Sequence, residues 1–82
     1  MLFHWDAVNE QELTAHGIAK ATAEAVFSSE DRAIVQDPRS LNRFIAEGTV
    51  DSKFYRVPFS NVFPAGIRIT TAFQVSRKRR RT

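Results

Sequence analysis

The chain has 82 residues, of which 43% are hydrophobic and 26% charged, and this composition is typical of one small globular domain. It contains no cysteine, which excludes disulfides, and its only histidines, His4 and His16, are too few for a structural zinc site. Residues 1–37 carry seven acids and two bases, whereas residues 38–82 carry ten bases and two acids, so the net charge of +3 hides a strongly basic second half.

The first part of the chain has the pattern of a short strand and two helices. Residues 2–5, LFHW, are predicted to form the strand. Asp6 is a predicted N-cap, because its carboxylate can accept hydrogen bonds from the first amides of a helix over residues 7–15. Gly17 is expected to end that helix by taking a positive φ. A second helix is predicted over residues 19–27, with one buried face formed by Ala19, Thr22, Ala23, Val26 and Phe27.

The pattern then changes to strands, which are predicted at residues 32–36, 41–48, 53–59 and 67–73. Asp37-Pro38 marks a turn, and residues 61–66 form a loop. Gly48 is expected to close the second of these strands. Pro58 has no N–H for a ladder, so the third strand should have an edge or a bulge there. In the last strand, one predicted face holds Ile67, Ile69, Thr71 and Phe73, and the other holds Arg68, Thr70 and Ala72.

Short connections between these strands imply antiparallel hairpins. We therefore predict an α+β domain in which two N-terminal helices pack on a four- to five-stranded, mainly antiparallel sheet. The domain should span residues 1–75, with residues 76–82 as a basic tail or short helix. A domain of this size has a thin core, so a partner chain is expected to add stability.

No apolar run approaches the roughly 20 residues that a membrane-spanning helix needs, and the N-terminus lacks the pattern of a secretory signal. We therefore expect a cytoplasmic protein without a cofactor. A basic half attracts phosphate-rich partners through counterion release, which makes nucleic acid a predicted partner. A solvated basic tail that only aids solubility is the alternative.

Several residues occur in an order that resembles a known family. Phe3, Trp5-Asp6 and Asn9 form the pattern F-x-W-D-x-x-N, and His16-Gly17-Ile18 and Val26-Phe27 follow it. This order resembles the N-terminal signature of the BrnT toxins, which are ribonucleases of bacterial type II toxin–antitoxin modules. Weaker matches continue through residues 43–45, Gly48 and residues 67–72, and the family, like this chain, ends in an arginine-rich segment.

The resemblance implies a RelE-like fold and metal-independent cleavage of RNA that arrests growth. It also implies a BrnA-type antitoxin partner, oligomeric complexes with that antitoxin, and contact with operator DNA only through the complex. Two departures stand out from the family pattern. Ser52-Lys53 replaces a common Gly-Arg, and Ala72-Phe73 replaces a common Ala-Arg. A lysine cannot clamp a phosphate with two parallel bonds as an arginine does.

A ribonuclease without a metal must stabilise the negative charge that builds on the phosphate oxygens, and positioned cations can do this. The predicted catalytic set is Arg43, Lys53 and Arg68 as phosphate-binding cations, with His16 as a candidate for proton transfer. His4, Tyr55 and a Lys53 of lowered pKa are further candidates for proton transfer. The predicted RNA-binding residues are Arg56, Arg77, Lys78, Arg80 and Arg81.

Each of these residues also has a structural interpretation. His16 is favoured as a helix C-cap, and His4 and Tyr55 as packing residues. Arg43 could pair with an acid of the N-terminal half. The basic tail could cover either RNA or an acidic antitoxin. A catalytically decayed relative that binds antitoxin and nucleic acid is the alternative function, and a basic nucleic-acid-binding protein unrelated to toxins is a third.

Overall fold

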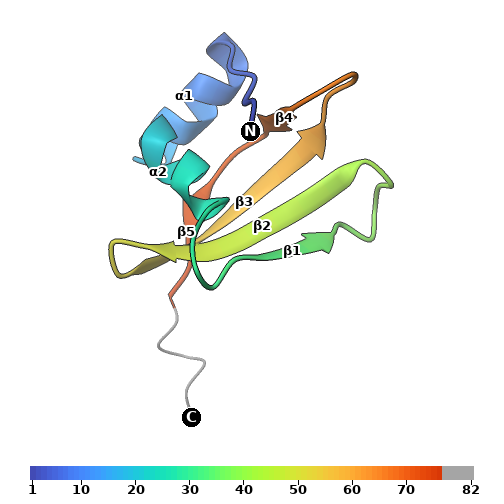
Figure 1. Ribbon diagram of the computed structural model, residues 1–82. Helices are drawn as coiled ribbons and strands as arrows, with labels where there is room; N and C mark the ends of the chain where they lie inside the picture. Colours follow the sequence, from blue (N-terminus) through green and yellow to red (C-terminus); the bar gives the residue numbers. More distant parts are fainter. Residues whose placement is uncertain (77–82) are drawn as a thin grey trace.

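In the computed structural model, which describes residues 1–76, the chain forms two helices and then five strands. The helices are α1 (Ala7–Ala15) and α2 (Lys20–Val26), and the strands are β1 (Ala33–Gln36), β2 (Arg43–Val50), β3 (Lys53–Asn61), β4 (Ile67–Ile69) and β5 (Phe73–Gln74). Figure 1 shows both helices on the same side of the twisted sheet. The predicted α+β architecture is confirmed, while the predicted basic run lies outside the described residues.

Both ends of α1 form as the sequence predicts. The Asp6 carboxylate accepts hydrogen bonds from the amides of Val8 and Asn9, and the Asn9 side chain accepts one in return from the Asp6 amide. This reciprocal capping box satisfies the first free donors of the helix. At the other end Gly17 has a φ of +69°, and its amide and that of Ile18 donate to the carbonyls of Thr14 and Leu13. These paired bonds close the helix in a Schellman motif.

The second helix is shorter than predicted by one residue at each end, because Ala19 is its N-cap and Phe27 its C-cap. Ala23, Val26 and Phe27 are buried as expected. Ala19, the N-cap, is exposed, and Thr22 is only half-buried, so the buried face is confined to the second half of the helix. The buried face of α2 packs on β2 and β3.

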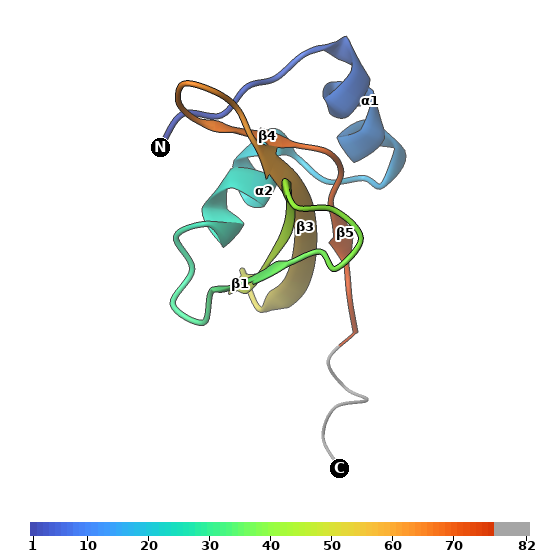
Figure 2. The same ribbon diagram turned by 90° about the vertical axis from the view of Figure 1, so that its right-hand side faces the viewer.

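The sheet is antiparallel with the strand order β1-β2-β3-β4, and β5 pairs with β3 along the same edge as β4. Residues of β3 alternate regularly between buried and half-buried positions, and Tyr55, Val57 and Phe59 are the buried ones. The side chain of Phe27 connects the helix layer to this face, because its ring meets those of Phe3 and Phe59 edge-on at 5.3 and 5.0 Å. Figure 2 shows how β4 and β5 follow one another along β3.

Several predicted strand boundaries are wrong: β1 begins one residue later than predicted, and β3 continues two residues further, to Asn61. Of residues 2–5, only Phe3 forms a bridge, which is parallel and joins Ile67. Gly48 does not close its strand, because β2 begins at Arg43 and continues to Val50. Gly48 lies inside β2 beneath α2, where a Cβ would collide with the hydroxyl of Ser29.

The predicted strand over residues 67–73 is divided into β4 and β5. Pro58 lies opposite the break: its carbonyl accepts a hydrogen bond from Thr70, but it has no N–H to continue the ladder. The pairing along this edge of β3 is thus interrupted at Pro58, between the part paired with β4 and the part paired with β5. The predicted alternation fails here, because Ala72 is fully buried in the core instead of lying beside Arg68.

Candidate nucleic-acid interface

The side of the sheet opposite the core is half-buried and carries most of the described cations of the basic half. We call this side the outer face. Its residues follow from the strand register, because directly paired residues lie on the same face of a sheet. They are Arg43, Ile45, Glu47 and Thr49 of β2; Phe54, Arg56, Pro58 and Ser60 of β3; Arg68 of β4; and Phe73 of β5.

Three polar side chains form one row across the outer face. Arg43 of β2 is paired with Ser60 of β3, and Ser60 is paired in turn with Arg68 of β4. Because adjacent strands lie about 4.8 Å apart, the two arginine Cα atoms are separated by about 10 Å. Two long guanidinium side chains at this spacing can converge on one phosphate above the hydroxyl between them. We call these three residues the arginine row.

Arg68 is held from the side by the N-cap of α1. Its Nη2 lies 3.1 and 3.0 Å from the two carboxylate oxygens of Asp6, and its Nε lies 3.2 Å from Oδ2. The Asn9 amide, and after it the hydrogen bonds from Arg68, lower the pKa of Asp6 below its ordinary value of 3.8. The Arg68 side chain is 32% exposed and that of Asp6 51%, so the pair is open to solvent and to an incoming anion.

Arg43 is exposed and forms no ion pair with any residue in the described part of the chain. The hydrogen bond from the Arg39 side chain is the main cause that lowers the pKa of Asp37, and the charge of Arg43 contributes least among the causes. Asp37 is therefore engaged by Arg39, at 3.2 Å. The guanidinium of Arg43 remains available for a ligand, which disfavours the structural interpretation of this residue.

Lys53 does not join the two arginines. It is the first residue of β3 and is paired with Val50 at the far end of the β2–β3 hairpin, seven positions from the pair formed by Arg43 and Ser60. At about 3.3 Å per residue this is roughly 23 Å. Lys53 also lies on the opposite side of the sheet, in line with Tyr55 and Val57. The prediction that Arg43, Lys53 and Arg68 hold one phosphate is therefore wrong for Lys53.

Arg56 lies on the outer face, but its charge is already paired. Its Nε donates to the Glu47 carboxylate across the strand pair at 2.7 Å. On its other side Arg56 is paired with Phe73 of β5. The His16 ring reaches Phe73 from the end of α1, with the ring centroids 6.2 Å apart. Arg56, Phe73 and His16 thus gather in a second row of the outer face.

The candidates for proton transfer are not placed beside the arginine row. His16 is the C-cap residue of α1, as favoured, and its ring lies at the second row. A ring nitrogen of His4 donates to the carbonyl of Ala65 at 3.0 Å, and Tyr55 is buried on the core side. Asp6 is the titratable group next to the row, and its lowered pKa makes it a weak base. The arrangement is thus better suited to binding a phosphate than to moving a proton.

Sequence reasoning missed Ser60 of the arginine row and the contact that Asp6 makes with Arg68. The sequence indicates no function for Ser60 and only a helix cap for Asp6. Neither has a local signal that indicates a second role, because Ser60 gains it from strand pairing and Asp6 from a contact 62 positions away. The predicted tail residues Arg77, Lys78, Arg80 and Arg81 lie outside the described residues.

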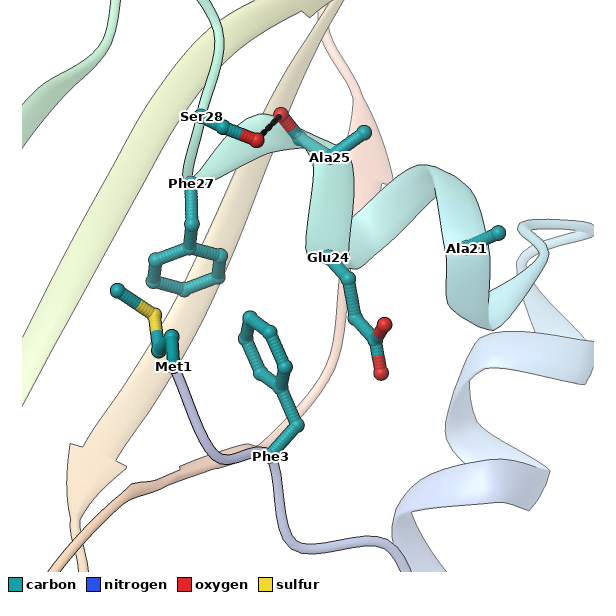
Figure 3. Close-up of a pocket in the computed structure, with 7 residues that line it drawn as sticks. All are labelled: Met1, Phe3, Ala21, Glu24, Ala25, Phe27 and Ser28. Carbon is teal, nitrogen blue, oxygen red and sulfur yellow. Dashed lines mark hydrogen bonds between the residues drawn. The ribbon is translucent and has the colours of Figure 1, made fainter.

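Two grooves lie on the helix side of the molecule. One, of about 470 Å³, runs between the N-terminal segment and α2 and is lined by Met1, Phe3, Ala21, Glu24, Ala25, Phe27 and Ser28. Figure 3 shows the Phe3 and Phe27 rings next to each other in it, with Glu24 as its charged side chain. The Glu24 carboxylate accepts a hydrogen bond from the Trp5 indole at 2.7 Å. Glu24 has the only charged side chain among these lining residues, so the groove does not suit an anionic ligand.

The second groove, of about 280 Å³, is mainly apolar and is lined by Met1, Phe27, Ile34, Phe44, Phe59, Asn61 and Ile67. Within residues 1–76, no group of three or more histidine, aspartate or glutamate side chains could hold a metal ion. No helix in the same range is long and apolar enough to cross a membrane.

The chain matches no protein-family model and no curated protein.

Proposed function

We propose that this protein is the toxin component of a bacterial toxin–antitoxin module and a metal-independent endoribonuclease of the BrnT type. In this proposal an antitoxin of the BrnA type neutralises it in the cytoplasm and carries the complex to operator DNA. The sequence signature described above suggests the family. The observation that supports an RNA phosphate as the ligand is the arginine row, with the exposed Arg43 and the half-exposed Arg68 flanking Ser60.

In the proposed mechanism the 2′-oxygen of a ribose attacks the adjacent phosphorus while the bond from that phosphorus to the 5′-oxygen of the next nucleotide breaks. The products are a 2′,3′-cyclic phosphate and a free 5′-hydroxyl, and water takes up the 2′-hydroxyl proton and protonates the leaving 5′-oxygen. Negative charge then builds on the phosphate oxygens, and the two guanidinium groups stabilise it. An arginine stays protonated and cannot accept the hydroxyl proton, so the row acts on charge and position alone. Arg68 would exchange its bonds to Asp6 for bonds to the phosphate, which is feasible because both side chains reach solvent.

The test is to induce the chain in bacteria and map new RNA 5′ ends across the transcriptome. New ends should appear with the wild-type chain and disappear with Arg43→Ala/Arg68→Ala. Lys53→Ala is the matched control, because it removes one cation from the far end of the hairpin. Cleavage retained in a folded, abundant Arg43→Ala/Arg68→Ala variant would contradict the proposal.

A second candidate function is a non-catalytic module that binds antitoxin and nucleic acid but does not cut RNA. The observation that favours it is the distance of Lys53 and His16 from the arginine row, which leaves the row without a suitable base. This module would bind RNA with the same dependence on Arg43 and Arg68 but produce no new 5′ ends. The same induction experiment, read together with a binding assay on the purified chain, distinguishes the two functions.

A further inference from the structure

We propose that Phe73, together with Arg56 beside it, forms a subsite where a base of single-stranded RNA stacks. The subsite lies on the outer face, next to but separate from the arginine row. This inference rests on the proposed RNA-binding function and deepens it, because it assigns the nucleobase as well as the phosphate to a place on the sheet.

Phe73 has the surroundings that a stacking platform needs. It is half-buried in β5 and is paired with Arg56 on the outer face of β3. Its ring is supported from one side by the His16 ring, at 6.2 Å and an angle of 44°. An aromatic ring that is supported at its edge and reaches solvent can accept a base of any sequence, because every base has a π-face.

Arg56 adds a second planar group to the same place. Its bond to Glu47 at 2.7 Å holds its side chain, which is 43% exposed. An ion-paired guanidinium keeps its planar face, and this plane can stack on a base. Arg56 is paired with Phe73 and lies four residues along β3 from Ser60, so we assign it to the base subsite and not to the phosphate row.

The spacing between the two rows suits one extended RNA strand that crosses the outer face. Arg56 and Ser60 are four residues apart on β3, which is about 13 Å. Pro58 lies between them and opposite Ile45, so the surface that joins the rows is apolar. A base stacked on Phe73 therefore belongs to a neighbouring nucleotide, not to the one whose phosphate lies at the arginine row.

The chemistry of the face favours single-stranded RNA over an acidic protein segment. A polyanionic peptide would gain from Arg43 and Arg68 but would meet the Glu47 carboxylate at the second row. Single-stranded RNA alternates anionic phosphates with planar, uncharged bases. That alternation matches the two rows of the face. One row presents two cations, and the other presents an ion pair of no net charge and the half-buried ring of Phe73.

The test compares two fluorescent RNA oligonucleotides of equal length, one with bases throughout and one with abasic sites at all internal positions. Binding to the full chain is measured by anisotropy. The wild-type chain should bind the base-bearing strand about 5- to 100-fold more tightly, which is the usual range for loss of one stacked base. Phe73→Leu should weaken binding of the base-bearing strand by a similar factor and leave binding of the abasic strand unchanged.

Two further variants make the result specific. Phe73→Trp keeps a stacking ring and should restore the preference for bases, which separates stacking from general packing. Phe63→Leu is the matched control, because Phe63 is 96% exposed in the β3–β4 loop and lies outside both rows. Thermal melting of each variant confirms that it is folded.

The outcomes separate this inference from the proposed function. Equal binding of the two strands, or loss of both on Phe73→Leu in a folded chain, overturns the stacking subsite. If binding nonetheless depends on Arg43 and Arg68, the phosphate row stands and only the base subsite fails. Absence of RNA binding by the wild-type chain would overturn both, and binding of an acidic peptide at the same face would replace RNA with a protein ligand.

Discussion

At the scale of single residues, the most specific part of the sequence signature has a structural explanation. Phe3 packs on Phe27, the Trp5 indole bonds to Glu24, Asp6 caps α1, and Asn9 completes the cap. The F-x-W-D-x-x-N pattern thus assembles the helix pair and the N-terminal segment. It supports the fold directly, and its one link to the proposed RNA site is Asp6, which also bonds to Arg68.

Asn9 is the residue of this pattern on which stability should depend most. It is completely buried; its Oδ1 accepts from the Asp6 amide, and its Nδ2 donates to the carbonyls of His4 and Ile69. Asn9→Ala would leave these groups without partners and should lower the free energy of unfolding by about 3 kcal/mol. Urea denaturation measures this. The exposed Asn42→Ala is the control, and a loss for Asn9→Ala no larger than that of the control would contradict the assignment.

Asp6 restrains Arg68, so removing its charge should strengthen RNA binding. Asp6→Asn keeps a good N-cap residue while it weakens the bidentate contact. The affinity for a single-stranded oligonucleotide should rise about 2- to 5-fold, as expected for release of one exposed ion pair. Asp51→Asn makes the same charge change in the β2–β3 turn, where the φ of +51° also suits asparagine. An equal rise for both variants would indicate a general charge effect.

The lowered pKa of Asp6 also predicts how stability depends on pH. The folded chain holds this carboxylate ionised below the ordinary value of 3.8, so below that pH the unfolded chain binds more protons. The stabilisation is complete above about pH 5 and is lost as the pH falls through the ordinary value and then the folded-state pKa. Asp37 shifts in the same direction and acts in the same window. Asp6→Asn should therefore make acid destabilisation shallower without abolishing it, as measured by urea unfolding across a pH series.

At the scale of elements, strand register decides which residues meet. The helices and the turn at Asp37-Pro38 were predictable, because caps, glycine and proline act locally. The arginine row was not, since Arg43, Ser60 and Arg68 are brought together only by pairing across three strands. Lys53 illustrates the reverse case. Its place in the sequence resembles that of a site residue, but the length of the β2–β3 hairpin places it far from the arginines.

The contact between α2 and β2 depends on Gly48 having no side chain. A Cβ at this position would collide with the Ser29 hydroxyl and approach the Val26 carbonyl at 3.3 Å. Gly48→Ala should therefore push the end of α2 away from the sheet and destabilise the fold by about 1–3 kcal/mol. Adding Ser29→Ala should recover part of this loss, because it removes the nearest atom. Denaturation midpoints that are unchanged by Gly48→Ala would contradict this packing.

At the scale of the whole molecule, the sheet has two sides with different roles. The helix side carries the core that the apolar pattern predicted, with Leu13, Val26, Val57 and Ile69 almost completely buried. The outer face combines cations with half-buried apolar side chains. Charge asymmetry along the chain indicated a phosphate-rich ligand, but only the folded sheet shows which of the cations share a face.

This arrangement predicts a specific dependence of RNA binding on salt. The logarithm of the affinity should fall linearly with the logarithm of the salt concentration, because bound cations release counterions from the strand. Arg43→Ala should reduce the slope by about 0.7, the value for one phosphate contact on a single strand. Lys53→Ala should leave unchanged the part of the slope that the cations of the outer face contribute. A larger reduction for Lys53→Ala than for Arg43→Ala would move the phosphate site to the other end of the hairpin.

The most direct test of the central claim is an NMR titration of the isotope-labelled full chain with a short single-stranded RNA. The side-chain Nε–H signals of Arg43 and Arg68 report on the arginine row, and that of Arg56 on the neighbouring one. We predict that the Arg43 and Arg68 signals shift together at the same RNA concentration, with the Asp6 contact to Arg68 replaced. Unmoved Arg43 and Arg68 signals, with shifts at Lys53 or along the groove beside α2, would contradict the account.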